Sequence, residues 1–184
     1  MRRWLILIPW IIGSLCGAAA FAEEGTYNSR FASIHYQDAS LLDSLARKIQ
    51  PSALTLSLNR IFMGGTKPSP SAKAGRCVDH LFQRVQVILE MPKPELKVHL
   101  RLYRNQDELS DAFSAITGRP TEIPAFYWTQ TNTIYLNLAR ITPGILAHEM
   151  GHAVIAHYFI VSPPEKIAEL LCQYVDREVS RGNF

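Results

Sequence analysis

The sequence predicts an α+β domain in which a small mixed sheet packs on helices. Apolar and charged residues alternate over residues 96–103, which is typical of a half-buried strand. Apolar residues recur at helical spacing over residues 76–90. Segments of both kinds follow one another along the chain without an internal repeat, and this order favours a single core.

The first half of the chain yields four predicted elements. Residues 31–36 form a short strand, and Asp38 caps an amphipathic helix that ends near Pro51. The stretch 64–75 is rich in Gly, Pro and Ser, and we expect a mobile surface loop there. A helix over residues 76–90 follows that loop.

The second half continues with the strand at 96–103 and a helix that begins at Asn105 and ends at Gly118. Residues 126–129 and 133–137 are predicted to form a hairpin. Thr142 and Pro143 then have the residue types of an N-cap and a first helical position. After a turn, a pair of prolines at 163–164 opens a last helix.

The helix that starts after Thr142 carries the most informative motif, the sequence HEMGH from His148 to His152. Residues four apart lie on one face of a helix, so His148 and His152 can bind one metal ion. Glu149 lies between them and can reach a water molecule at the metal, which is the position of a general base.

A catalytic zinc ion needs a third protein ligand and keeps its fourth position for water. His157 lies five residues after His152, a spacing that points its side chain away from the metal face. Glu169 lies on the next predicted helix, and the 16 residues between it and His152 suffice for a turn and a returning helix. We therefore expect Glu169 to be the third ligand.

His148, Glu149, His152 and the downstream Glu169 resemble the zinc site of the gluzincin metallopeptidases, the thermolysin-like branch of the zincins. Residues 132–176 are similar to small peptidase-MA-like domains, with a strand, the HExxH helix, a turn and a helix that carries the glutamate. The resemblance implies a zincin-like fold, one zinc ion held by His148, His152 and Glu169, and Glu149 as the base.

The sequence departs from this family in two places. Many gluzincins have an acidic residue four positions after the ligand glutamate, where this chain has Gln173. Asp176 could instead supply a carboxylate that orients a metal ligand. Only 15 residues follow Glu169, so the C-terminal lobe is reduced and the oxyanion-stabilising group stays unassigned. Three tyrosines are equal candidates for that role: Tyr127, Tyr158 and Tyr174.

The resemblance implies a zinc metallopeptidase that hydrolyses peptide bonds of a peptide or protein substrate. Zinc would lower the pKa of its bound water to about 7, and Glu149 would take the proton during attack on the carbonyl. By the same resemblance, strand 133–137 would lie at the edge of the cleft and pair with the extended substrate. The alternative is a zinc-binding, catalytically weak or inactive zincin-like domain that binds a partner or an envelope component.

The first 22 residues are predicted to be a secretory signal peptide. Two arginines precede an uncharged run at 4–21, and the sequence Ala-Phe-Ala ends at Ala22. We therefore expect an exported protein, periplasmic or extracellular, with residues 23–184 as one domain. The alternative is an uncleaved membrane anchor at 4–21, the one way in which membrane contact is expected.

Charge and cysteine content limit the remaining possibilities. Removal of residues 1–22 takes away two arginines and no acid, so the formal charge falls from +3 to +1, with 17 basic residues against 16 acidic ones. This balance argues against a nucleic-acid partner, which calls for a clustered basic excess. Cys77 and Cys172 remain, either as a disulfide or as two buried thiols. The oligomeric state is not predicted.

Overall fold

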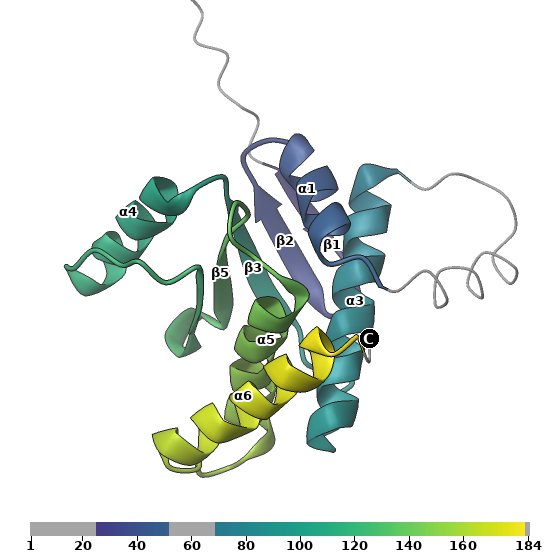
Figure 1. Ribbon diagram of the computed structural model, residues 1–184, viewed down its shortest axis with the longest axis vertical. Helices are drawn as coiled ribbons and strands as arrows, with labels where there is room; N and C mark the ends of the chain where they lie inside the picture. Colours follow the sequence, from purple (N-terminus) through teal and green to yellow (C-terminus); the bar gives the residue numbers. More distant parts are fainter. Residues whose placement is uncertain (1–24, 52–68, 183–184) are drawn as a thin grey trace, which may run out of the picture.

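A computed structural model describes residues 25–51 and 69–182 (Figure 1). These residues form a mixed α+β fold with one five-stranded sheet and five α-helices. In chain order the elements are β1 (Gly25–Asn28), β2 (Ala32–Tyr36), α1 (Ser40–Lys48), α3 (Pro70–Leu89), β3 (Val98–Tyr103), α4 (Gln106–Thr117), β4 (Ala125–Trp128), the 3₁₀ turn η1 (Thr129–Thr131), β5 (Thr133–Asn137), α5 (Pro143–Tyr158) and α6 (Glu165–Ser180).

The strands lie in the order β1-β2-β3-β5-β4. β2, β3 and β5 are parallel, and the antiparallel strands β1 and β4 form the two edges. The strands predicted at 31–36 and 96–103 and the hairpin of β4 and β5 are confirmed, whereas β1 was not predicted. The expectation that strand 133–137 is an edge strand is wrong, because β5 pairs with β3 on one side and β4 on the other.

Alternation along β3 shows how the sheet divides the core. Val98, Leu100 and Leu102 are buried in the large cluster that includes residues of α1, α3, α5 and α6. Their neighbours point to the opposite face, where Leu109 of α4 packs with Phe126 in a smaller cluster. Figure 1 shows α4 on one side of the sheet and α1 and α3 on the other. Each fully buried leucine side chain contributes about 1.5–3 kcal/mol to this packing.

The predicted loop at 64–75 is wrong for residues 70–75, which form the first turns of α3. The Ser69 side chain accepts the Ala72 N–H, and Pro70 occupies the first turn, where no helical N–H partner is needed. The residue types taken as a loop signal are thus those of a helix start. Residues 64–68 of the predicted loop lie outside the described residues.

Several predicted helix ends agree with the structure. Asn105 accepts the Glu108 N–H at the start of α4, and Gly118 ends that helix with φ of 74°. Asp38 accepts the Ser40 N–H at 2.8 Å, although the residue at the N-cap position of α1 is Ala39. These contacts are local in sequence, which is why residue types alone predicted them.

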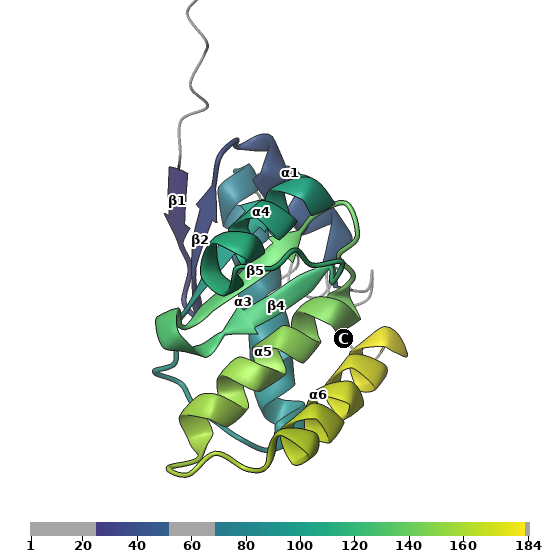
Figure 2. The same cartoon turned by 90° about the vertical axis from the view of Figure 1, so that its left-hand side faces the viewer.

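Helices α5 and α6 lie side by side, with α5 next to the sheet and α6 against α5 and α3, as Figure 2 shows from a second direction. They approach each other closely at Gly151, where an added Cβ would lie 3.1 Å from Sγ and 3.6 Å from Cα of Cys172. A side chain at position 151 would therefore push α6 away from α5.

Cys77 and Cys172 are both buried and form no disulfide, in agreement with the expectation of two buried thiols. Within the described ranges, no helix is long and apolar enough to cross a membrane. The predicted signal segment at 1–22 lies outside these ranges.

Candidate metal centre

The two histidines of the HEMGH motif lie on α5 with their ring nitrogens close together. Thr142 caps this helix by accepting the Ile145 N–H at 3.2 Å, and Pro143 begins its first turn, as predicted. One turn separates His148 from His152, so both rings leave the same face, and their Nε2 atoms are 3.1 Å apart. The rest of the helix is largely buried, which fixes the positions of both imidazoles.

Glu169 reaches the same point from α6. The chain leaves α5, turns over residues 159–164 and returns, and this brings Oε2 of Glu169 to 3.5 Å from Nε2 of both histidines. Nε2 of Gln173, one turn further on, donates to Oε1 of Glu169 at 3.0 Å and fixes the carboxylate. Gln173 therefore holds the third predicted ligand from the position where an acidic residue was expected.

The spacing of these three atoms fits a zinc ion. Two ligand atoms about 2.0–2.1 Å from a tetrahedral ion lie about 3.3–3.4 Å apart. The three separations found here are 3.1, 3.5 and 3.5 Å. Two imidazole nitrogens and one carboxylate oxygen are also a ligand set found in catalytic zinc sites. The residues present thus fit one zinc ion.

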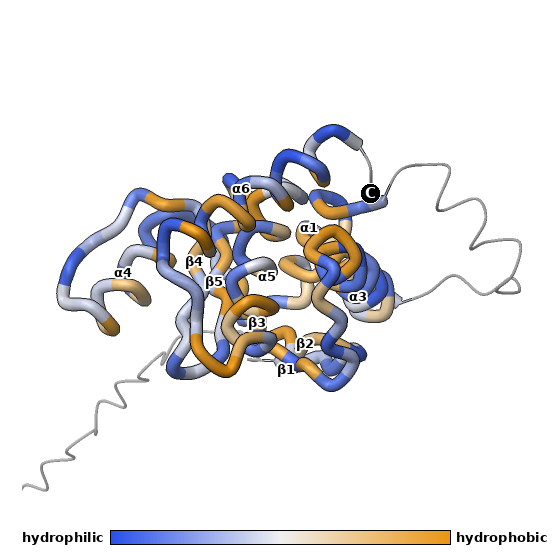
Figure 3. Tube along the Cα trace, turned by 90° about the horizontal axis from the view of Figure 1, so that it is seen from below, coloured by the Kyte–Doolittle hydropathy of each residue, from blue (hydrophilic) through white to orange (hydrophobic). Residues whose placement is uncertain are grey.

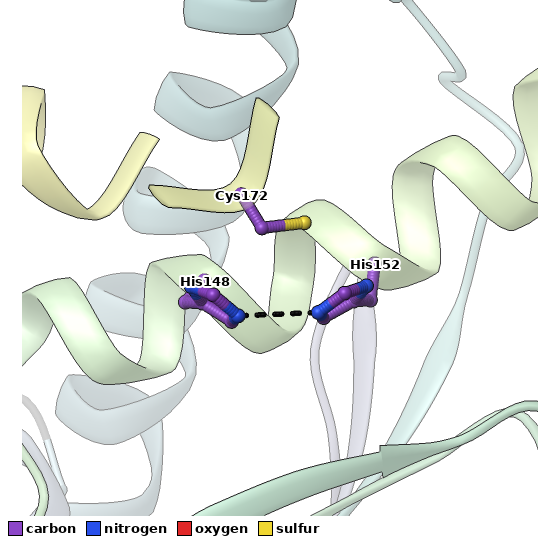
Figure 4. Close-up of side chains that lie close together, drawn as sticks. All are labelled: His148, His152 and Cys172. Atoms are coloured by element: carbon purple, nitrogen blue, oxygen red, sulfur yellow. Dashed lines mark hydrogen bonds between the residues drawn. The ribbon is translucent and has the colours of Figure 1, made fainter. Parts of the chain in front are cut away.

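The structure adds one residue that sequence analysis did not place here. Sγ of Cys172, one turn after Glu169, groups with ring nitrogens of His148 and His152, all within 4.8 Å of one another (Figure 4). The thiol is fully buried between the two helices, and burial raises its pKa, with a further contribution from the nearby Glu149 and Glu169 carboxyl groups. Glu169 remains the expected third ligand, because its Oε2 lies 3.5 Å from Nε2 of both histidines.

Electrostatics favour the protonation states that a metal needs. Burial lowers the pKa of His152, and the neighbouring His148 lowers it further, so that the neutral ring is favoured. For Glu169, desolvation opposes ionisation, but the hydrogen bond from Gln173 and the two imidazoles outweigh it and lower the pKa. Neutral imidazole and ionised carboxylate are the metal-binding forms.

The carboxyl group of Glu149 is desolvated and lies in the same cleft as the two histidines and Glu169. The pKa of this carboxyl group is raised to about 7, mainly by desolvation. A hydrogen bond from the backbone of Tyr127 lowers this pKa in part, and the nearby Glu169 carboxylate raises it further. A carboxyl group with a pKa near neutrality can both take and return a proton at physiological pH.

These residues line a cleft of about 480 Å³ between β4, α5 and α6. Apolar residues form most of its remaining wall, and three residues with hydroxyl groups, Tyr127, Thr129 and Ser162, also line it. The lining consists of Ile123, Ala125, Phe126, Tyr127, Thr129, His148, Glu149, His152, Ile155, Ala156, Ser162, Pro163, Ala168 and Glu169.

The strand along this cleft is β4, and it has a free main-chain edge. The Asn137 N–H donates to the Pro124 carbonyl at 2.9 Å, which sets the alternation of the antiparallel pair. By that alternation Phe126 bonds to β5, whereas the N–H and C=O groups of Ala125 and Tyr127 point to the free edge. The backbone of Tyr127 is the one that reaches Glu149. The cleft edge predicted for residues 133–137 is therefore formed by the preceding strand.

Other candidates lie elsewhere or have another partner. The Tyr127 hydroxyl donates to Oδ1 of Asn132 at 3.0 Å, and Tyr158 and Tyr174 are not among the cleft residues. Nδ1 of His157 lies 2.9 Å from the Ala153 carbonyl on its own helix, away from the cluster of metal-ligand atoms. Asp176 accepts from the Ser180 hydroxyl at 2.9 Å.

Comparison of the chain with protein-family models, with curated proteins and with solved structures found no match to any of them.

Proposed function

We propose that this protein is an exported zinc metallopeptidase with a zincin-like fold and a gluzincin-type site. The observation that carries the proposal is the triangle of Nε2 of His148, Nε2 of His152 and Oε2 of Glu169, with sides of 3.1, 3.5 and 3.5 Å. Beside this triangle, Glu149 lies desolvated in the same cleft. A metal cage with an adjacent base is the arrangement that peptide hydrolysis requires.

A zinc ion in this cage would supply a Lewis acid that polarises the scissile carbonyl and makes water a stronger nucleophile. Glu149 takes the proton of the attacking water on its carboxylate and returns it to the leaving amine. Its pKa of about 7 suits both transfers. The hydrogen bond from the Tyr127 backbone holds the carboxylate in position between them.

The free edge of β4 supports a peptide as the substrate. An extended chain can pair with the outward N–H and C=O groups of Ala125 and with the C=O group of Tyr127, which needs no particular side chains. The pairing would place one peptide bond alongside Glu149, because Tyr127 already reaches that carboxylate.

The proposal is tested by measuring zinc content and hydrolysis together on the same protein. Glu149→Gln is expected to keep about one zinc ion per chain and to lose cleavage of a quenched fluorescent casein by about 100- to 10,000-fold. Glu95→Gln is the matched control, because Glu95 is an exposed residue that does not line the cleft. Full cleavage by Glu149→Gln, or purified protein that binds no zinc, would refute the proposal.

A second candidate function is a zinc-binding domain without turnover that binds a partner. The observation that favours it concerns the three tyrosines considered as oxyanion donors. Tyr127 has its hydroxyl engaged by Asn132, and Tyr158 and Tyr174 do not line the cleft. Incubation of the zinc-loaded protein with a broad peptide library separates the two functions, because stable zinc with no cleaved peptide supports the second.

A further inference from the structure

The turn between α5 and α6 exposes an unusual amount of apolar surface. Ile160 and Val161 are 104% and 81% exposed, and Tyr158 and Phe159 just before them are about two-fifths exposed. Single exposed apolar residues are ordinary on protein surfaces, but four consecutive ones form a patch that calls for a partner.

The outer face of α6 extends this patch. Ile167, Leu170 and Tyr174 are 46%, 54% and 48% exposed, and their spacing of three and four residues puts them in one stripe. The core-facing side of the same helix is formed by other residues, Cys172, Val175 and Val179. Figure 3 shows hydrophobic and hydrophilic stretches alternating along α6. The helix therefore has a second apolar stripe that its own core does not use.

Basic residues accompany this stripe. Lys166 is exposed and lies next to Ile167, and Arg177 is exposed and lies within one turn of Tyr174. Neither residue forms an ion pair among the residues that the structure describes. Nζ of Lys93 lies 5.8 Å from the centre of the Tyr158 ring, at the turn. The surface thus has an apolar centre with positive charge beside it.

Acidic residues of α6 lie mainly on the other side. Glu169 and Asp176 face α5, since Glu169 meets the histidines and Asp176 lies against Gly144. Glu165 is close enough to His152 to affect its pKa. Glu178 forms an ion pair with Arg181 at 2.9 Å. The acidic residues of α6 thus lie near α5 or are paired, whereas Lys166 and Arg177 are exposed without an ion pair among the described residues.

We propose that this surface, formed by residues 158–161 with Ile167, Leu170 and Tyr174, binds an anionic lipid bilayer. Exposed aliphatic side chains enter the boundary between headgroups and acyl chains, and aromatic rings such as those of Tyr158, Phe159 and Tyr174 favour that depth. Lysine and arginine beside the apolar stripe are complementary to anionic headgroups. The proposal is independent of the metal site.

Vesicle binding of the full chain tests the proposal. The probes are vesicles of phosphatidylcholine alone and vesicles of phosphatidylcholine mixed with phosphatidylglycerol. The double variant Ile160→Ser/Val161→Ser is expected to lower partitioning into the anionic vesicles by about tenfold or more, since one aliphatic side chain contributes about that factor. Val87→Ser is the matched control, because Val87 is 58% exposed on α3, outside this surface.

A local probe separates this surface from any contact made by the N-terminal segment. In a Tyr174→Trp variant, the added fluorescence is expected to shift to the blue with anionic vesicles and to be quenched by brominated lipid. Lys166→Glu combined with Arg177→Glu is expected to reduce this quenching, as is high salt.

The outcomes decide between lipid and other partners. Quenching that depends on anionic lipid, together with the loss in the double variant, supports the proposal. Unquenched tryptophan with unchanged vesicle binding overturns it. An oligomer in sedimentation that the Ile160→Ser/Val161→Ser variant dissociates, without quenching by lipid, also overturns it and identifies a second copy as the partner.

Discussion

Shortening Glu169 by one methylene group, in Glu169→Asp, is expected to weaken zinc binding by about 100-fold or more. Oε2 of Glu169 lies 3.5 Å from each histidine nitrogen, and loss of one carbon–carbon bond withdraws the carboxylate by about 1.5 Å. Zinc coordination tolerates deviations of only about 0.2 Å. Helix α6 cannot follow, because it already contacts α5 at Gly151.

The expected loss of zinc affinity follows from the shorter reach of the side chain, because aspartate retains the negative charge. Substitutions outside the ligand shell already weaken metal binding by about 10- to 100-fold, and loss of a ligand exceeds that range. Competition with a chromophoric zinc indicator at constant pH gives the dissociation constants. Glu165→Asp, one turn earlier on α6, is the control and is expected to bind zinc like the parent protein.

Equal zinc affinity in Glu169→Asp and the parent would show that Glu169 is not a ligand. The structure offers one alternative for that case, since Sγ of Cys172 lies close to the same two histidines. Cys172→Ala is expected to weaken zinc binding by no more than about 10- to 100-fold, the range for a residue outside the ligand shell. A larger loss there than in Glu169→Asp would make the ligand set His148, His152 and Cys172.

Three further outcomes test the surroundings of the site. His157→Ala is expected to leave zinc stoichiometry unchanged in elemental analysis, because its ring contacts Ala153 on its own helix; loss of zinc would contradict the ligand assignment. Thr142→Ala removes the cap of α5 and is expected to lower the free energy of unfolding by about 1 kcal/mol in urea titrations, with Thr142→Ser as control. Gly151→Ala and Cys172→Ala are expected to be coupled by about 1 kcal/mol or more in a double-mutant cycle, because removal of Sγ opens the space that a Cβ at 151 needs; additive effects would refute this contact.

Where the structure depends on neighbours in sequence, the sequence predicted it. The caps by Asn105 and Thr142 each satisfy an N–H three residues ahead, so residue type and spacing are sufficient. The prediction for the start of α3 also rested on residue types, but it was wrong. Ser69 and Pro70 are both turn formers and helix starters, and only the helix that follows decides between these roles.

In the candidate site, too, the features that depend on local sequence were predicted and the one that depends on helix packing was not. The spacing of His148 and His152 requires only a helix, and Glu169 requires only a turn long enough for α6 to return. The proximity of Cys172 depends on how closely two helices pack, and that distance is set by the missing side chain at Gly151. The motif alone does not reveal that its fourth residue has this packing role.

The strand along the cleft was misassigned because the order of strands in a sheet is not their order in the chain. β5 enters the sheet between β3 and β4, so its main-chain groups on both sides are already bonded, and a peptide has nothing left to pair with there. β4 pairs on one side only, and its free side is where Tyr127 reaches Glu149. The sheet order therefore decides which strand can accept substrate, and it puts the open main-chain groups beside the proposed base.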